Sequence, residues 1–250
     1  SDHTAMTLRA ALDAAGVRCG DVHSHPGPSG MSVAISLPDG SYGAIIVSGA
    51  NLLFRPEAVT LPKGCAALLL QSEIAETANL ALAVKARASG VRVILNAAPA
   101  RAISAALLAC TDLLVVNRGE AADLLGRPET GLDAREAAAC LAVQGPGAVI
   151  VTLGAEGLVL AGIKGAGHYP ARRATVVSTH GAGDAFIGAL AAEWARGTEL
   201  TVAAAFGQVA AALHVGTDVN HRSAVTEALV RQKLDQGFTL TELSNGLPGM

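Results

Sequence analysis

Short apolar runs alternate with helical patterns along the middle of this chain, and no other feature of the sequence limits its fold as much. Four runs have the length and apolar composition of buried strands: Ala66–Leu70, Val91–Leu95, Asp112–Val116 and Ala148–Leu153. Helical patterns follow the first three at Ser72–Ser89, around Ser104 and at Glu120–Leu125, and another begins at the capping pair Asp133 and Glu136. This order predicts an α/β fold with a mostly parallel sheet flanked by helices on both faces.

The segment before this alternation predicts a second, smaller unit. Residues 1–15 form an amphipathic helical pattern closed by Gly16. Met31–Leu37 and Ser41–Val47 then flank Pro38-Asp39-Gly40, a sequence typical of a β-hairpin turn. We interpret residues 17–47 as a β lid, and residues 1–16 together with 48–250 as the α/β core.

The last third of the chain predicts strands and then helices. We expect a short antiparallel run at Leu158–Ala161, Gly167–Pro170 and Ala174–Val177. Three helices follow near Ala182–Arg196, Thr201–Val215 and Ser223–Gln236, and Leu240–Met250 is expected to be a loose tail.

Composition and charge exclude several classes of function. The 250 residues are 51% hydrophobic and 16% charged, which suits a compact enzyme. A net charge of −3 provides no basic field for nucleic acid or anionic lipid. The apolar runs are too short to span a bilayer, no signal-peptide pattern opens the chain, and the four cysteines are widely spaced. We therefore expect free thiols, no membrane or nucleic-acid partner and a cytoplasmic location.

In open parallel sheets, ligands bind beyond the carboxyl ends of the strands. The loops at those ends are Gln71–Glu73, Asn96–Arg101, Asn117–Glu120 and Thr152–Gly157. They contain most of the candidate binding residues.

The segment Ser178–Leu190 carries the sharpest chemical signal. Small residues open a helix there, so that several backbone N–H groups can converge on one anion. Asp184 stands in that first turn, where a phosphate would repel it unless it took a proton from an attacking hydroxyl. The alternative is that an acidic residue simply favours the positive end of a helix. A dinucleotide fingerprint is excluded because Phe186 occupies the place of its third glycine, and a Walker A loop is excluded because the chain has no Gly-Lys pair.

Ser178–Phe186 resembles the signature Asp-Thr-x-Gly-Ala-Gly-Asp-x-Phe of the ribokinase-like, or phosphofructokinase B, family, except that serine replaces the first aspartate. The resemblance covers about Asp2 to His214, and it is strong because several weaker landmarks follow in the family's order. These are Gly49-Ala50-Asn51, Gln71-Ser72-Glu73, Asn96–Arg101, Asn117–Ala121 and Thr152–Gly157.

The resemblance implies a ribokinase-like fold and an ATP-dependent sugar kinase. Such an enzyme transfers the γ-phosphate of ATP to a hydroxyl of ribose or a similar small sugar, with Mg²⁺ as cofactor. The resemblance to the ribokinase branch also implies a small-molecule sugar as substrate, and we expect a homodimer formed through the β lid.

The resemblance assigns a role to each candidate residue. Asp184 would be the base and would contact the substrate, and Gly181, Ala182 and Gly183 would form the anion hole. Glu73 would bind a sugar hydroxyl, and Gln208 would lie near adenine. Asn117 and Glu120 would handle the phosphates and the water shell of Mg²⁺. The nucleotide site would be lined by Thr152, Leu153, Gly154, Ala155, Glu156 and Gly157.

Three of these assignments have simpler alternatives. Asn117 and Glu120 could form an ordinary helix cap. Glu73 could merely stand at a helix N-terminus, and Gln208 could be a polar position on an alanine-rich helix.

The sequence also departs from the family pattern. Residues 2–16 resemble a helix from inside that pattern, and the family's first strand, its sugar-binding aspartate and its Gly-Gly-Lys-rich loop have no counterpart. The alternative function is therefore a non-catalytic or degenerate nucleotide-binding remnant of a sugar kinase. Ser178 and His180 stand at the family's monovalent-cation site, but the charge is missing and the Gly216–Arg222 loop differs. We expect activity to change little between sodium and potassium.

Overall fold

The computed structural model describes residues 2–36, 42–162 and 165–236 and contains two separate sheets. The smaller sheet is the antiparallel pair β1 (Met31–Ser36) and β2 (Tyr42–Val47). The larger sheet has the order β3-β4-β5-β6-β7-β8. Its bounds are β3 (Ala67–Gln71), β4 (Arg92–Asn96), β5 (Leu113–Asn117), β6 (Ala148–Thr152), β7 (Leu158–Gly162) and β8 (Gly165–Tyr169). β3 to β6 run parallel, whereas β7 and β8 are antiparallel additions.

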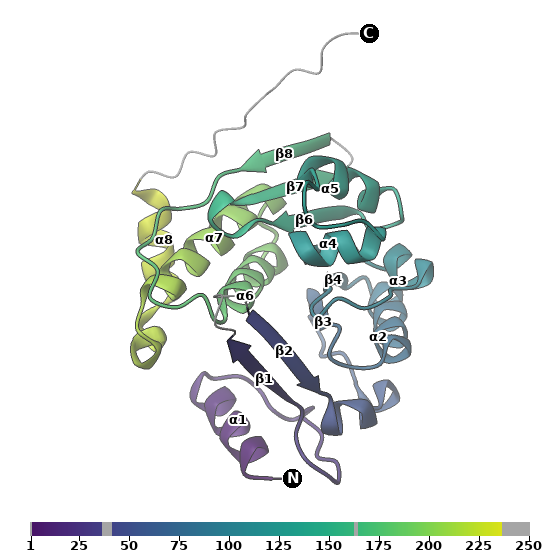
Figure 1. The fold of residues 1–250 in the computed structure, drawn as a ribbon. Coiled ribbons are helices and arrows are strands. Elements are labelled where there is room, and N and C mark those ends of the chain that lie inside the picture. Colours follow the sequence, from purple (N-terminus) through teal and green to yellow (C-terminus); the bar gives the residue numbers. More distant parts are fainter. Residues whose placement is uncertain (1, 37–41, 163–164, 237–250) are drawn as a thin grey trace, which may run out of the picture.

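Helices cover both faces of the larger sheet (Figure 1). One face packs against α2 (Glu76–Ala88), α3 (Ala105–Ala109), α4 (Arg118–Leu125) and α5 (Ala134–Ala142). The other packs against α6 (Ala182–Ala195) and α7 (Leu200–Gly216), and α8 (Glu227–Asp235) packs on α7. The strands have this double cover because alternate residues bury themselves on opposite sides: Val93 and Leu95 face α2–α5, whereas Ile94 faces α6 and α7. The predicted α/β fold is confirmed.

The N-terminal helix α1 (His3–Ala14) lies beside the small sheet, away from the main core (Figure 1). Asp2 caps it by accepting a 2.8 Å hydrogen bond from the Ala5 amide, and it also accepts one of 2.7 Å from the Ser29 amide. The hydrogen bonds from Ser29 and Ala5 lower the pKa of Asp2 to about 2. α1 buries none of its own residues, so this bridge is a main tie between the helix and the chain that leads into β1.

The start of one predicted helix and the existence of one predicted strand are wrong. The helix expected from Ser72 begins only at Glu76, because the Ser72 amide donates to the Ala98 carbonyl and the chain forms a turn first. The strand expected at Ala174–Val177 does not form. The amides of Val177 and Ser178 both donate to the Val215 carbonyl at the end of α7, and Val176 and Val177 are exposed. The turn Pro38-Asp39-Gly40 and the tail Leu240–Met250 lie outside the described residues.

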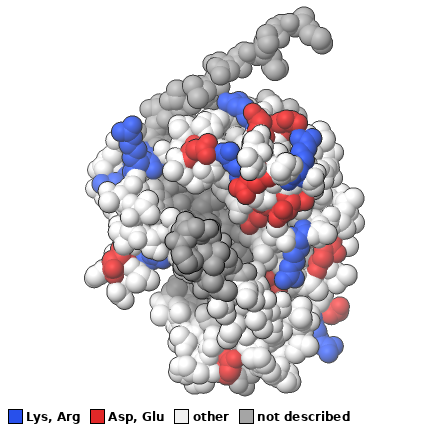
Figure 2. All heavy atoms as spheres, viewed as in Figure 1, with Lys and Arg blue, Asp and Glu red and all other residues white. Residues whose placement is uncertain are grey.

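Charged side chains form no continuous basic patch on the face in Figure 2. Acidic and basic groups are interspersed over α4 and α5, and few occur over α1 and the small sheet. Among the helices of the described residues, none has both the length and the apolarity needed to cross a bilayer. All four cysteines are free thiols, as predicted.

α6 and α7 pack so closely that their backbones nearly touch. A side chain added at Gly207 on α7 would place its Cβ 2.8 Å from the Phe186 carbonyl oxygen on α6. Alanines at 203, 204 and 205 are buried along the same helix. The small residues of α7 therefore set the distance between the two helices.

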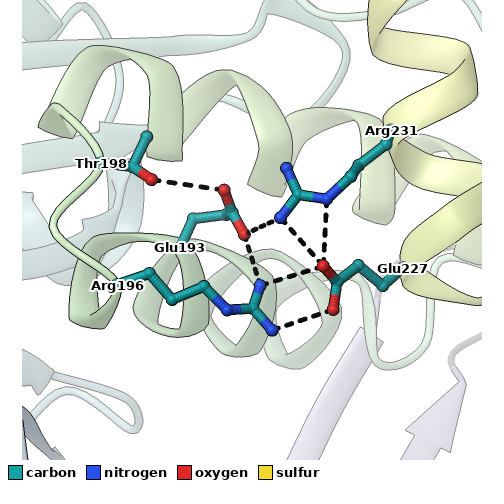
Figure 3. A network of polar contacts seen from close by, with 5 residues as sticks. All are labelled: Glu193, Arg196, Thr198, Glu227 and Arg231. Carbon is teal, nitrogen blue, oxygen red and sulfur yellow. Dashed lines mark hydrogen bonds and ion pairs between the residues drawn. The ribbon is translucent and has the colours of Figure 1, made fainter.

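A network of ion pairs joins the C-terminal end of α6 to α8 (Figure 3). Glu193 is buried, and its carboxylate lies 2.6 Å from Arg196 and 2.5 Å from Arg231. Exposed Glu227 on α8 pairs with both arginines at 2.9 Å. Since Glu193 is the buried member, both guanidinium groups are oriented around it.

We expect Glu193→Gln to lower the free energy of unfolding by on the order of 2 kcal/mol, because a buried carboxylate that accepts charged hydrogen bonds loses its charge. Urea denaturation of the full chain measures this change. Glu227→Gln is the matched control, because it removes the same charge from an exposed position of the same network and should have a clearly smaller effect. Equal effects of the two variants would show that burial of Glu193 contributes nothing.

Candidate active site

A cavity of about 650 Å³ opens where β6 ends. Four segments line it: the loop after β6, the connection between β8 and α6, the first turns of α6, and α7. Seven of the predicted site residues share this lining. They are Thr152, Gly154, Ala155, Gly157, Ala182, Gly183 and Gln208. The structure therefore brings the predicted nucleotide loop and part of the predicted anion hole into one space.

The loop after β6 turns sharply because two of its residues are glycines. Gly154 and Gly157 have φ of +56° and +102°, which other residues rarely adopt. A Cβ at Gly157 would also lie 2.1 Å from the Tyr169 carbonyl oxygen. Only glycine lets the backbone that leaves β8 cross the loop this closely. Leu153 closes the turn by donating its amide to the Gly157 carbonyl at 2.8 Å.

The start of α6 leaves several backbone donors free. Gly181 is the N-cap, with φ of +77°, and no side chain caps the helix. Within the described chain the amides of Gly181, Gly183 and Asp184 have no hydrogen-bond acceptor, whereas the Ala182 amide donates to the Thr179 carbonyl at 3.1 Å. Unpaired amides at a helix N-terminus bind anions well. Ala182 therefore lines the cavity, but its amide is already paired. The amides of Gly181, Gly183 and Asp184 are the available donors.

Asp184 is exposed in the first turn of α6, directly after Gly183. Its carboxylate has no ion pair or hydrogen bond with any described residue. Exposure is compatible both with an acidic residue that only stabilises its own helix and with one that contacts a ligand. This carboxylate is free to accept a proton from a ligand.

Asn117 and Glu120 form a capping box at the start of α4. The Glu120 amide donates to the Asn117 Oδ1 at 2.8 Å, and the Asn117 amide donates to the Glu120 Oε2 at 2.7 Å. These contacts are those of an ordinary helix cap, which was the simpler alternative for this pair. Burial raises the pKa of Glu120, and the hydrogen bond from Asn117 opposes that rise.

The capping box borders the cavity without lining it. Asn117 pairs in register with Thr152 across β5 and β6. Arg118, the next residue, forms a 2.9 Å ion pair with Glu156 of the loop after β6. The segments Asn117–Glu120 and Thr152–Gly157 are therefore held side by side. Leu153 and Glu156 do not line the cavity.

Gln208 is buried on α7 and faces the cavity. Its Nε2 donates to the carbonyls of Tyr169 and Pro170 at 3.2 and 3.3 Å, which fixes the chain leaving β8. Its Oε1 is buried and has no partner among the described residues. A buried acceptor without a donor is costly, and a ligand N–H would satisfy it.

Sequence reasoning missed two arginines on the cavity wall. Arg172 and Arg173 lie in the connection between β8 and α6. Burial lowers the pKa of Arg172, which nevertheless remains charged near neutral pH. The only signal in the sequence was the Arg-Arg pair itself, since nothing in the spacing indicates that this connection folds over the end of β6.

Glu73 lies outside this cavity, in the turn after β3. Gln71 pairs in register with Asn96, and the Ser72 amide donates to the Ala98 carbonyl at 3.0 Å. The Gln71–Glu73 and Asn96–Arg101 segments therefore meet. Glu73 does not decorate a helix N-terminus, because α2 starts three residues later.

The described residues contain no group of three or more histidine, cysteine, aspartate or glutamate side chains that could hold a metal ion. Glu120 uses Oε2 in the capping box and keeps Oε1 without a partner in that part of the chain. One carboxylate oxygen fits Mg²⁺, which keeps most of its waters and takes the rest of its ligands from phosphates. The carbonyls of Ser178 and His180 already accept hydrogen bonds from Arg222, so they do not fit a monovalent cation.

Comparison with known proteins matches residues 1–220 to a family described as pfkB family carbohydrate kinase. The chain is 33% identical over 171 residues to ribokinase of Mus musculus, covering 65% of this chain and 53% of that protein. It is 34% identical over 170 residues to deoxyribokinase of Salmonella typhi, covering 65% and 55%. The matches thus span about half the length of these relatives.

The fold also matches a solved structure, that of Arabidopsis thaliana ribokinase complexed with ribose and ATP. The TM-score is 0.73 with 28% sequence identity, and the match covers 86% of this chain and 71% of that one. A score of this size over most of the chain means that the two share the order and arrangement of their elements.

Proposed function

The chain belongs to the pfkB family of carbohydrate kinases, and on that premise we propose that it transfers the γ-phosphate of ATP to a hydroxyl of ribose or a similar small sugar. One observation carries the proposal: the loop after β6 and the free amides at the start of α6 border one cavity, with Asp184 beside them. Sequence relatives that are a ribokinase and a deoxyribokinase, and a related structure with ribose and ATP, support a pentose as the acceptor.

The nucleotide would lie in the cavity between the β6 loop and α7. A volume of about 650 Å³ is in the range of small-molecule sites. Gln208 offers its unpaired Oε1 to an N–H group such as the amine of adenine. A Cβ at Gly154 would meet no atom within 4 Å, so this glycine leaves room for the ligand to approach the backbone. The two arginines of the β8–α6 connection would supply positive charge for its phosphates.

Transfer would take place at the first turn of α6. The amides of Gly181, Gly183 and Asp184 would receive the charge that develops on the transferred phosphoryl group. Asp184 would accept the proton of the attacking hydroxyl, for which its carboxylate is accessible and unpaired in the described chain. Glu73, in the turn after β3, would hold a sugar hydroxyl.

Mg²⁺, when bound, would neutralise the charge of the phosphates. The free Oε1 of Glu120 would hold it through a water molecule. The capping box holds both this carboxylate and the Asn117 side chain in place at the end of β5.

We expect Asp184→Asn to lower the turnover number by about 10² to 10⁴, because it removes the general base. ATP affinity should stay nearly unchanged, since the backbone amides and the cavity remain. Phosphate transfer to ribose and deoxyribose, together with calorimetric titration of ATP, measures both quantities. Asp235→Asn, an exposed change at the end of α8, is the control.

A near-normal rate in Asp184→Asn would contradict the role of this residue as base. If the parent chain binds ATP but transfers phosphate to no pentose, the alternative of a nucleotide-binding remnant is favoured instead.

Gly183→Ala should weaken ATP binding about tenfold, or 1.4 kcal/mol, because the new methyl group stands on the cavity wall. No atom lies within 4 Å of the added Cβ, so the fold tolerates it and gains helix propensity. Gly188→Ala on the same helix has equal room and lies outside the lining. Calorimetry and urea denaturation should show both variants at least as stable as the parent and only Gly183→Ala impaired. Equal ATP affinity in both would remove Gly183 from the site.

Homodimerisation through the β1–β2 sheet remains a prediction. Met31 and Val33 face Val47 and Ile45 in register, and all four side chains are exposed. A second copy would cover this apolar face. Sedimentation equilibrium should report a dimer that Val33→Lys shifts to monomer, and a monomeric parent chain would contradict the prediction.

A further inference from the structure

Arg222 reaches back over forty residues of sequence to the turn in front of α6. It stands in the short helix η4 (Val219–Ala224), between α7 and α8. Its NH1 donates to the His180 carbonyl at 2.9 Å, and its NH2 donates to the Ser178 carbonyl at 3.3 Å. The Nε2 of His214 donates to the same His180 carbonyl at 3.1 Å.

The segment that Arg222 holds leads directly to the free amides of α6. The amides of Val177 and Ser178 donate to the Val215 carbonyl, which fixes the start of this segment. At its end, a Cβ on Gly181 would lie 2.9 Å from His214 Nε2 and 3.9 Å from Arg222 NH1. The turn is therefore packed against the end of α7 and the guanidinium group, and its shape sets where the first amides of α6 point.

The contact geometry is that of a cation bound by two carbonyl oxygens. Ser178 and His180 turn their carbonyls toward one point, and the guanidinium group occupies it. Arginine stays protonated at any ordinary pH, so this positive charge is permanent. A free monovalent cation would have to displace these hydrogen bonds and would be repelled by the charge. Ser178 offers no carboxylate to attract it.

We propose that Arg222 is a positioning residue that serves as a built-in cation: it holds the Ser178–Gly181 turn and thereby aims the amides at the start of α6. The inference rests on the proposed kinase function and deepens it. It assigns the predicted independence from potassium to a side chain of the protein itself.

The test compares Arg222→Ala with the parent chain in potassium, sodium, tetramethylammonium and dilute guanidinium chloride at constant ionic strength. The turnover number of the parent should be the same in all four. Arg222→Ala should lose about 10²-fold in turnover number, the effect of misplacing groups by about 1 Å, with little change in the KM for ATP. Guanidinium or potassium should restore part of the rate, and tetramethylammonium should not.

His221→Ala is the matched control, because it changes an exposed residue of the same short helix whose side chain has a polar contact only with Asp218 among the described residues. It should behave as the parent does. Arg222→Lys keeps the charge and should retain more turnover than Arg222→Gln. This pair replaces Arg222→Ala if the latter does not fold.

Three results would overturn the proposal: parent activity that rises several-fold with potassium, an Arg222→Ala variant with normal turnover, or a loss that no cation restores. The last result would mean a merely structural contact.

If the parent chain transfers phosphate to no pentose, the proposed function fails, and melting temperature then tests Arg222 by itself. Guanidinium or potassium, relative to tetramethylammonium, should raise the melting temperature of Arg222→Ala and leave that of the parent unchanged. Equal responses of the two proteins would overturn the role of Arg222.

Discussion

The close contact between α6 and α7 is the constraint on which the candidate site depends. Gly207 lies against the Phe186 carbonyl, with no room for a side chain, and small residues continue along α7. Because the two backbones approach this far, the first turn of α6 and Gln208 line the same cavity. The alanine and glycine content of the C-terminal helices is therefore a geometric requirement of the site. Larger residues at these positions would separate the amides at the start of α6 from the cavity wall that Gln208 contributes.

The two ends of α6 differ in how far their polar groups are paired. At its N-terminus the amides are unpaired and the Asp184 carboxylate is accessible, so binding energy is left for a ligand. At its C-terminus every charge is matched, with Glu193 buried between two arginines. The ion pairs at the C-terminus hold α6 against α8. The N-terminus can therefore keep unpaired amides without losing its position. The parallel strands β5 and β6 also end at one edge of the sheet, where Asn117 and Thr152 pair in register. The ligand-facing groups therefore gather at that edge.

The sequence alone was sufficient for most strands, because buried strands in a parallel sheet are continuous apolar runs with little ambiguity. It failed where local signals competed with distant partners. Ser72 has the composition of a helix cap, yet its amide bonds to Ala98 in the next loop, and Val177 bonds to the end of α7 instead of a strand. The candidate site was predictable where a motif is contiguous, as in Thr152–Gly157. The positions of Arg172 on the cavity wall and of Arg222 at the turn before α6 were not predictable, because each depends on chain segments that only the fold brings together.

On the proposed role of Arg222, its position makes the turn before α6 sensitive to local opening of η4 and α8. The helix η4 buries none of its residues, and α8 buries only Val230. Segments with so little buried surface open locally at a lower free energy than the sheet and the helices that cover it. Each such opening would withdraw the guanidinium from the turn before α6 while the β6 loop and Gln208 stay folded. Heat would then inactivate the protein before it melts, and amide hydrogen exchange in η4 and α8 would follow the loss of function more closely than exchange in the core.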